Sequence, residues 1–213
     1  MVILMTDFFT IEKPSVFEET EKRSKFISYS FEIDSIDDVK LRLEIIKSKH
    51  WDAKHCVYAY SLKGISAEKF SDDGEPGGTA GMPVLNAIRS EQLTNTLVVV
   101  VRYFGGILLG TSGLRKMYSS GAINVLKISN KVLVTLCAEV EIKADYHSFK
   151  GATKEISNFG GKVLKVEFGE TVQILAVIPK NNFDNFCSKI SKYGCASTKV
   201  SFNKETYVKL KKV

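Results

Sequence analysis

The sequence predicts an α+β protein made of two domains, residues 8–130 and residues 135–213. Its 213 residues suffice for two ordinary domains, and 44% hydrophobic and 25% charged residues are typical of a globular protein. The first part of the chain mixes strand and helix patterns with two glycine-rich loops. The last part repeats a strand–helix unit, which favours a separate small domain.

The first predicted domain contains four strand patterns rich in β-branched and aromatic residues. The most apolar run, residues 97–101, is short and β-branched, which is typical of a buried strand. The predicted strands are residues 24–32, 55–62, a short one near 68–70, and 96–103.

Three helix patterns accompany these strands. Ser35 can cap the first helix, because Asp38 stands three residues later in a sequence close to a capping box. Pro83 suits the first turn of a second helix that runs to about residue 89. A third helix is predicted for residues 114–128, after the second glycine-rich loop.

The second predicted domain contains a repeat of an alternating strand followed by an amphipathic helix. Two sets of helix-face positions share the same spacing, namely Tyr146, Phe149, Thr153, Ile156 and Phe183, Phe186, Ile190, Tyr193. Gly160-Gly161 stops the first helix, and Gly169-Glu170 suits a hairpin turn. The order β-α-β-β-α-β predicts a ferredoxin-like fold, with two unrelated amphipathic helices as the alternative.

The composition points to a cytoplasmic protein with an acidic partner. The net charge of +6 favours RNA or a phosphate-containing ligand. No apolar run is long enough to cross a membrane, and residues 2–5 are too few for a secretory signal. Four cysteines without clip spacing are expected to be reduced thiols; they are Cys56, Cys137, Cys187 and Cys195.

The two glycine-rich loops, residues 71–81 and 105–113, each precede a predicted helix. A helix N-terminus presents unpaired N–H groups, so a loop and helix start together can bind an anion. Arg115 and Lys116 fall in the first turn of the predicted third helix, where cations oppose the helix dipole unless an anion is bound. The candidate anion- or RNA-binding residues are Gly77, Gly78, Thr79, Arg102, Gly105, Gly106, Gly110, Thr111, Ser112, Gly113, Arg115 and Lys116.

The first loop also carries acidic residues. Asp72, Asp73 and Glu75 could hold Mg²⁺ or Ca²⁺ through oxygen ligands, but their spacing does not match a calcium loop. We prefer a turn at Asp73-Gly74 and expect neither a metal nor a cofactor. His55 is a polar partner or base if the fold brings it to this loop, and otherwise a structural histidine.

Several motifs together resemble the YigZ/IMPACT family. They are Lys22-Arg23-Ser24-Lys25-Phe26-Ile27, His55 with Ala59-Tyr60, the loop from Ser71 to Pro83, and the segment from Val99 to Gly110. The resemblance implies an N-terminal α/β sandwich like the second domain of the small-subunit ribosomal protein S-five. It also implies a C-terminal ferredoxin-like domain akin to those of translocating elongation factors.

The functional implications of the resemblance are uneven. Eukaryotic IMPACT relatives regulate translation during amino-acid starvation, largely through an additional N-terminal domain that this sequence does not contain. For the shared domain the resemblance implies association with nucleic acid or the ribosome. It carries over no catalytic residues.

Two hypotheses from different classes follow. The first is a noncatalytic, translation-associated regulatory protein that binds RNA or the ribosome through a glycine-rich, basic surface. The alternative is an enzyme that acts on a phosphorylated small molecule or nucleotide, and a protein-interaction module is a third reading. The first two hypotheses require the two glycine-rich loops to converge on one electropositive pocket.

Overall fold

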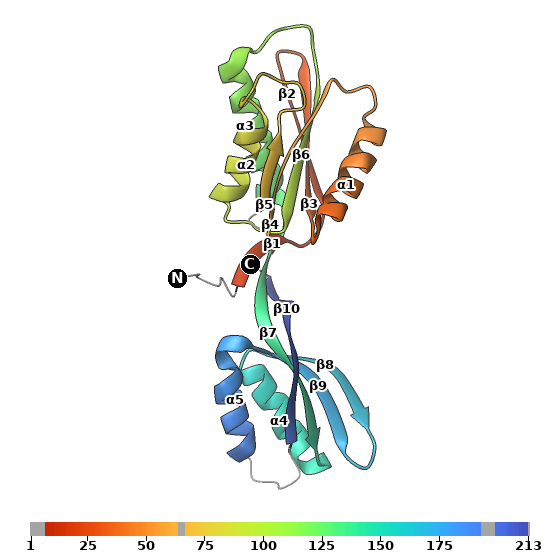
Figure 1. Cartoon of the computed structure of the whole chain (residues 1–213), viewed down its shortest axis with the longest axis vertical. Helices are drawn as coiled ribbons and strands as arrows, with labels where there is room; N and C mark the ends of the chain where they lie inside the picture. Colours follow the sequence, from red (N-terminus) through yellow and green to blue (C-terminus); the bar gives the residue numbers. More distant parts are fainter. Residues whose placement is uncertain (1–6, 64–66, 193–198, 213) are drawn as a thin grey trace. The chain divides into compact units, whose positions relative to one another are not determined.

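The computed structural model describes residues 7–63, 67–192 and 199–212, and its contacts divide the chain into two units (Figure 1). One unit, here the N-terminal unit, is residues 8–132. The other, the C-terminal unit, contains Asp7 and residues 133–212. None of the helices in the described parts of the chain has the length and apolar character needed to cross a membrane.

The N-terminal unit is a five-stranded sheet covered by helices on both faces. The sheet order is β2-β3-β6-β4-β5. Helix α1 packs on one face, and α2 and α3 pack on the other. The elements of this layered structure are β2 (Ser15–Glu21), β3 (Ser24–Glu32), α1 (Ile36–Lys49), β4 (His55–Leu62), β5 (Ala67–Ser71), α2 (Gly81–Ser90), β6 (Thr96–Tyr103) and α3 (Gly110–Ile128). The short strand β1 (Asp7–Ile11) precedes them and is not part of this sheet.

Strand β6 lies at the centre of this sheet, antiparallel to β3 and to β4. Val98 and Val100 pack with α2 and α3, whereas Val99 and Val101 pack with α1. Both faces of the strand are therefore buried, which explains why its sequence is continuously apolar rather than alternating. The prediction of a buried strand at residues 96–103 is confirmed.

The predicted cap of α1 is confirmed. Ser35 has an extended backbone, and its hydroxyl accepts a hydrogen bond of 3.1 Å from the N–H of Asp38. The Asp38 carboxylate accepts in return from the N–H of Asp34, at 3.0 Å. The first bond satisfies one of the N–H groups that a helix start leaves without intrahelical acceptors, and the second holds the residue before the cap.

The start of α3 differs from the prediction. The helix begins at Gly110, four residues before Leu114, so Gly110 to Gly113 form its first turn instead of a loop. Arg115 and Lys116 consequently lie in the second turn, where the helix dipole opposes a cation less than at the terminus. The expectation that they occupy the first turn is wrong.

The C-terminal unit is a sheet with two helices on one face. Its elements are β7 (Lys131–Ala144), α4 (Tyr146–Asn158), β8 (Lys162–Phe168), β9 (Val172–Pro179), α5 (Lys180–Lys192) and β10 (Lys199–Lys212). The strand order is β1-β7-β9-β8, and β10 also pairs with β7. Both β7 and β8 are antiparallel to β9.

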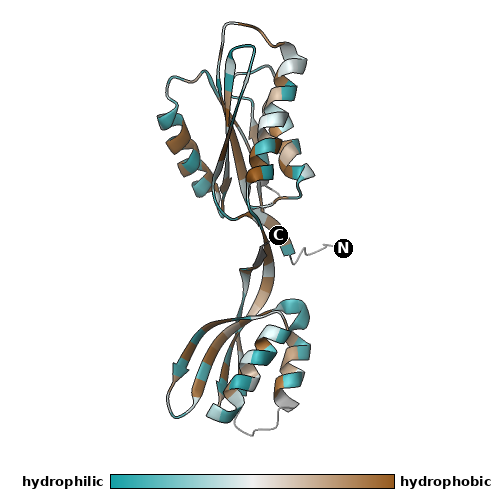
Figure 2. Cartoon of the chain, turned by 180° about the vertical axis from the view of Figure 1, so that it is seen from behind, coloured by the Kyte–Doolittle hydropathy of each residue, from teal (hydrophilic) through white to brown (hydrophobic). Residues whose placement is uncertain are grey.

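The core of this unit lies between the sheet and the two helices. Ile142 and Ile174 from the strands and Ile156 and Phe186 from the helices are almost fully buried. Figure 2 shows that the helices carry hydrophilic as well as hydrophobic residues, as expected for helices that pack by one face. The predicted stop at Gly160-Gly161 is confirmed, because α4 ends at Asn158 and the N–H of Gly161 bonds to the carbonyl of Ile156 at 2.8 Å. Tyr193 of the predicted repeat lies outside the described residues.

Candidate functional site

Four connecting segments meet at one end of the N-terminal sheet. They are the β2–β3 turn, the α1–β4 turn, the β5–α2 loop and the β6–α3 loop. The strand register explains the meeting, because Lys25 lies opposite Tyr103 and His55 lies opposite Arg102. The strands β3 and β4 begin where β6 ends, so both glycine-rich loops lie at this end.

The Asp72 carboxylate holds the β5–α2 loop in place. It accepts hydrogen bonds from the backbone N–H groups of Gly78 (2.9 Å), Ala80 (3.0 Å) and Gly81 (2.8 Å). Two of these donors belong to the start of α2, which has no cap from its own N-cap side chain. Burial alone would raise the pKa of Asp72, but the three N–H bonds outweigh it and lower the pKa below the ordinary value.

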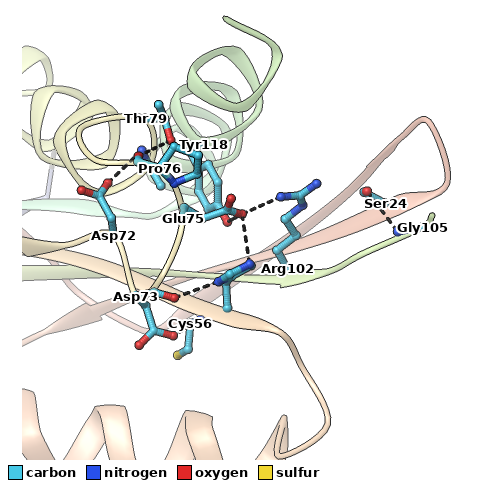
Figure 3. Close-up of polar contacts among 12 residues, drawn as sticks. Ser24, Cys56, Asp72, Asp73, Glu75, Pro76, Thr79, Arg102, Gly105 and Tyr118 are labelled. Carbon is cyan, nitrogen blue, oxygen red and sulfur yellow. Dashed lines mark hydrogen bonds and ion pairs between the residues drawn. The ribbon is translucent and has the colours of Figure 1, made fainter. Parts of the chain in front are cut away.

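Glu75 is the centre of a buried polar cluster (Figure 3). Its Oε1 accepts from the Arg102 guanidinium at 2.6 Å and from the Tyr118 hydroxyl at 2.8 Å. The side chains of Glu75 and Arg102 are only 3% and 6% exposed. The cluster therefore ties the first loop to β6 and to α3. Burial, followed by the charge of Glu75, raises the pKa of Tyr118 far above its ordinary value, so this hydroxyl stays protonated and donates.

His55 joins the same cluster from the start of β4. Its Nδ1 lies 2.8 Å from the carbonyl oxygen of Asp73, and since a carbonyl only accepts, Nδ1 carries the proton. Its Nε2 then faces Oε1 of Glu75 at 3.8 Å. The fold thus brings His55 to the acidic loop, as a polar partner that fixes the loop backbone.

The three acidic residues of the first loop do not converge. Asp72 binds backbone N–H groups and Glu75 pairs with Arg102, as described above. The Asp73 carboxylate accepts from the N–H of Cys56 at 2.7 Å and lies 3.7 Å from Lys47. Across the described residues, no three His, Cys, Asp or Glu side chains are arranged to hold a metal ion.

The second glycine-rich loop packs against the β2–β3 turn. The N–H of Gly105 donates to the Ser24 hydroxyl at 3.1 Å. A Cβ on Gly105 would lie 2.0 Å from the carbonyl carbon of Arg23, so only glycine fits there. Gly106 and Gly110 have positive φ, of 83° and 72°, and a side chain at either would meet open space.

The start of α3 is exposed and lacks a side-chain cap. Thr111 and Ser112 are exposed in its first turn, and Gly113 is half-buried. Arg115 and Lys116 are exposed in the second turn and have no carboxylate partner among the described residues. These two side chains remain available to an anionic ligand.

The structure places Arg102 differently from the expectation of an anion ligand. Its guanidinium is buried, pairs with Glu75, and lies 5.5 Å from the ring centroids of both Phe26 and Phe104. Thr79 is also buried, and its hydroxyl donates to the carbonyl of Pro76 at 2.6 Å. Arg102 and Thr79 therefore stabilise the loops from inside, while Gly77, Gly78 and Gly106 lie at or near the surface.

Sequence reasoning missed three cations at this end of the sheet. Lys22 and Arg23 form the two-residue β2–β3 turn, are exposed, and have positive φ of 45° and 64°. Lys54 lies with its Nζ 5.3 Å from the ring centroid of Phe104. The sequence signal that could have identified Lys22 and Arg23 was a basic pair between two strands, at turn positions where glycine or asparagine is usual. We call Lys22, Arg23, Lys54, Arg115 and Lys116 the basic rim.

Comparison with known proteins identifies the family. The Impact N-terminal domain model matches residues 22–126. The IMPACT family member of Haemophilus influenzae is 32% identical over 190 residues, covering 88% of this chain and 92% of that protein. The IMPACT family member YigZ of Escherichia coli is 30% identical over 187 residues, covering 86% of this chain and 92% of that protein. A crystal structure of a hypothetical protein, 30% identical, matches 92% of this chain and 97% of its own with a TM-score of 0.63. With relatives this similar over most of its length, the chain belongs to the IMPACT family.

Proposed function

We propose that the chain is a noncatalytic, translation-associated regulatory protein that binds RNA or the ribosome through the basic rim. The observation that carries the proposal is the exposure of Lys22, Arg23, Arg115 and Lys116 without any carboxylate partner among the described residues. Exposed cations that are not neutralised internally attract a phosphate backbone. A role at the ribosome would place the protein in the cytoplasm.

The conformation of the β2–β3 turn supports this proposal. Non-glycine residues at positive φ are strained, and the turn holds Lys22 and Arg23 in a conformation that glycine or asparagine adopts more easily. Residues held in strained backbone conformations cluster at active sites and ligand clamps. The carboxylate of Asp52, in the α1–β4 turn, accepts a hydrogen bond from the Tyr103 hydroxyl at 3.2 Å, so its hydrogen-bond partner among the described residues is a tyrosine and not a cation of the basic rim.

The exposed glycines supply a second kind of contact. No atom lies within 4 Å of a Cβ built at Gly77, Gly78, Gly106 or Gly110, so a ligand can approach the backbone there. The first N–H groups of α3 lack intrahelical acceptors and add a partial positive charge beside the basic rim. The buried Glu75 cluster keeps the surrounding loops in one conformation, which lowers the entropy cost of binding.

The translational part of the proposal rests on the resemblance to the IMPACT family, whose eukaryotic members regulate translation largely through a domain outside the part shared with this chain. We also infer the finer fold from the same resemblance. The helix-covered sheet of the N-terminal unit suits the second domain of ribosomal protein S-five. The C-terminal order of β10, β7, β9 and β8, with both helices on one face, suits a ferredoxin-like domain.

A co-sedimentation experiment tests the proposal. The full chain is mixed with purified ribosomes, or with RNA, at increasing salt, and bound protein is measured in the pellet. We expect binding that weakens steeply with salt, because each neutralised phosphate releases counterions. The double variant Arg115→Gln/Lys116→Gln should bind less tightly and with a shallower salt dependence, by about one unit of slope for each phosphate that is no longer neutralised.

The matched control removes the same charge elsewhere on the N-terminal unit. Lys40 is 67% exposed on α1, where it pairs with Asp37 at 2.9 Å, and Lys127 is exposed in the last turn of α3. The variant Lys40→Gln/Lys127→Gln should bind nearly as the wild type does. Equal reductions in affinity for the two double variants would show that only net charge matters, and absence of binding at low salt would refute the proposal. The enzymatic alternative gains no support from the first loop, whose carboxylates are occupied by protein partners.

A further inference from the structure

We propose that Trp51 and Phe104 form a base-stacking site, which gives the chain a preference for unpaired RNA nucleotides over duplex RNA. The inference rests on the proposed function and names its substrate class. Trp51 was not among the residues expected to bind. It lies in the α1–β4 turn, at the same end of the sheet as the basic rim.

Trp51 is a highly exposed aromatic side chain. It is 84% exposed, close to the 81% of Leu108 in the β6–α3 loop, and it is the one tryptophan of the chain. No ring or charged group of the described residues contacts the indole. Its packing therefore contributes little to the stability of the unit, and both faces of the ring are accessible to a ligand.

The turn that carries Trp51 is held firmly. The N–H of Ala53 bonds to the carbonyl of His50 at 3.0 Å, and the N–H of Lys54 bonds to the carbonyl of Arg102 at 3.2 Å. The His50 ring is buried between two hydroxyls, 2.7 Å from Tyr29 and 2.8 Å from Tyr103. The indole is thus displayed on a fixed backbone, so little conformational entropy is lost when a ligand binds.

Phe104 provides a second aromatic surface beside this turn. It directly follows β6 and is 41% exposed. Lys54 belongs to the same turn as Trp51. The Lys54 ammonium and the Arg102 guanidinium lie over the Phe104 ring, at 5.3 and 5.5 Å from its centroid. A base would stack on Phe104 by displacing the exposed Lys54 side chain, whose ammonium could then bind the phosphate of the same nucleotide.

The combination of rings and unpaired cations favours single-stranded RNA. Proteins that bind single strands pair aromatic stacking surfaces with a basic path for the phosphates. Duplex RNA is recognised mainly through its phosphates and 2′-hydroxyls, and its bases are not free to stack on a side chain. A protein partner would also use an exposed tryptophan, but it would not need the four cations, Lys22, Arg23, Arg115 and Lys116, that lack a carboxylate partner among the described residues.

Binding of a labelled twelve-nucleotide oligouridylate and of a duplex RNA of equal length, followed by fluorescence anisotropy, tests the inference. The wild-type chain should bind the single strand more tightly. Trp51→Ala should weaken single-strand binding about 5- to 150-fold, the range expected when one base no longer stacks on a ring, and should leave duplex binding unchanged. Trp51→Phe should restore much of the affinity, and Phe104→Ala should weaken it. The matched control is Leu41→Ala, because Leu41 is also an exposed apolar residue, at 53%.

The emission of Trp51 gives an independent readout, since no other tryptophan contributes. We expect it to be quenched when unlabelled oligouridylate saturates the wild-type chain. Salt-sensitive RNA binding that is equal for single strand and duplex, and equal in Trp51→Ala, would overturn the stacking site while leaving the proposed function standing. Binding to RNA-free ribosomal proteins that disappears in Trp51→Ala would identify a protein interface and would also overturn it. No binding to either RNA at low salt refutes both proposals.

Discussion

Replacing Glu75 with Gln tests whether the buried ion pair holds the loop end of the N-terminal unit together. Gln has the same size and can still accept from Tyr118, but it removes the charge that offsets Arg102. Because both side chains are at most 6% exposed, the unpaired guanidinium would stay out of water. Removing one partner of such a pair typically costs about 3–5 kcal/mol of folding stability.

The measurement is urea unfolding followed by far-UV circular dichroism. The emission of Trp51 is a poor reporter because the indole is already 84% exposed in the folded chain. The matched control is Glu68→Gln, which breaks the ion pair with Arg89 on the surface, where the side chains are 36% and 51% exposed. Exposed pairs contribute less than about 1 kcal/mol, so this variant should unfold nearly as the wild type does.

A double variant separates charge from shape. Glu75→Gln/Arg102→Met removes both charges and keeps a side chain of similar length at position 102, so it should be more stable than Glu75→Gln alone. The reasoning is refuted if Glu75→Gln lowers the free energy of unfolding by no more than Glu68→Gln does. It is also refuted if the double variant is no more stable than the single one.

Three further predictions concern the same end of the unit. Asp72→Asn should cost about 1–3 kcal/mol and speed hydrogen exchange at the amides that Asp72 binds. Because the pKa of Asp72 is lowered, its contribution is present above the ordinary value of 3.8 and is lost as the pH falls through the lowered value, and a pH series of exchange should show this step only in the wild type. Gly105→Ala should destabilise by about 1–3 kcal/mol through the clash with Arg23, whereas Gly77→Ala should change the melting temperature little. Burial and then the charge of Asp73 raise the pKa of Cys56 to about 11, so mass spectrometry should find this thiol unmodified at pH 8 until the chain unfolds.

The elements that the sequence predicted well are those governed by local rules. Ser35 caps α1 because a short hydroxyl side chain satisfies an N–H group only a few residues away. The strand at residues 96–103 was recognised because a buried central strand needs apolar residues on both faces. The start of α3 was misplaced because Gly110 and Gly113 have low helix propensity, whereas the partly buried Leu109 before them packs against the core.

The candidate site was harder to predict because its contacts join distant parts of the chain. Arg102 was expected to face a ligand, and nothing near it in the sequence shows that Glu75, in another loop, takes its charge. The position of Lys54 beside Phe104 follows from the pairing of β4 with β6, which a residue pattern does not encode. The basic character of the beginning of α3 was visible in Arg115 and Lys116, since it depends on composition alone.

The buried bonds of Glu75 divide the loop end into two parts with different freedom to change in evolution. Glu75, which anchors the first loop from inside, is constrained by partners on three separate elements, Arg102 on β6, Tyr118 on α3 and His55 on β4. Outward positions such as Gly77 and Arg115 have no such partners among the described residues. Related proteins can therefore diversify the outer residues, and with them the choice of ligand, while inheriting an unchanged internal scaffold.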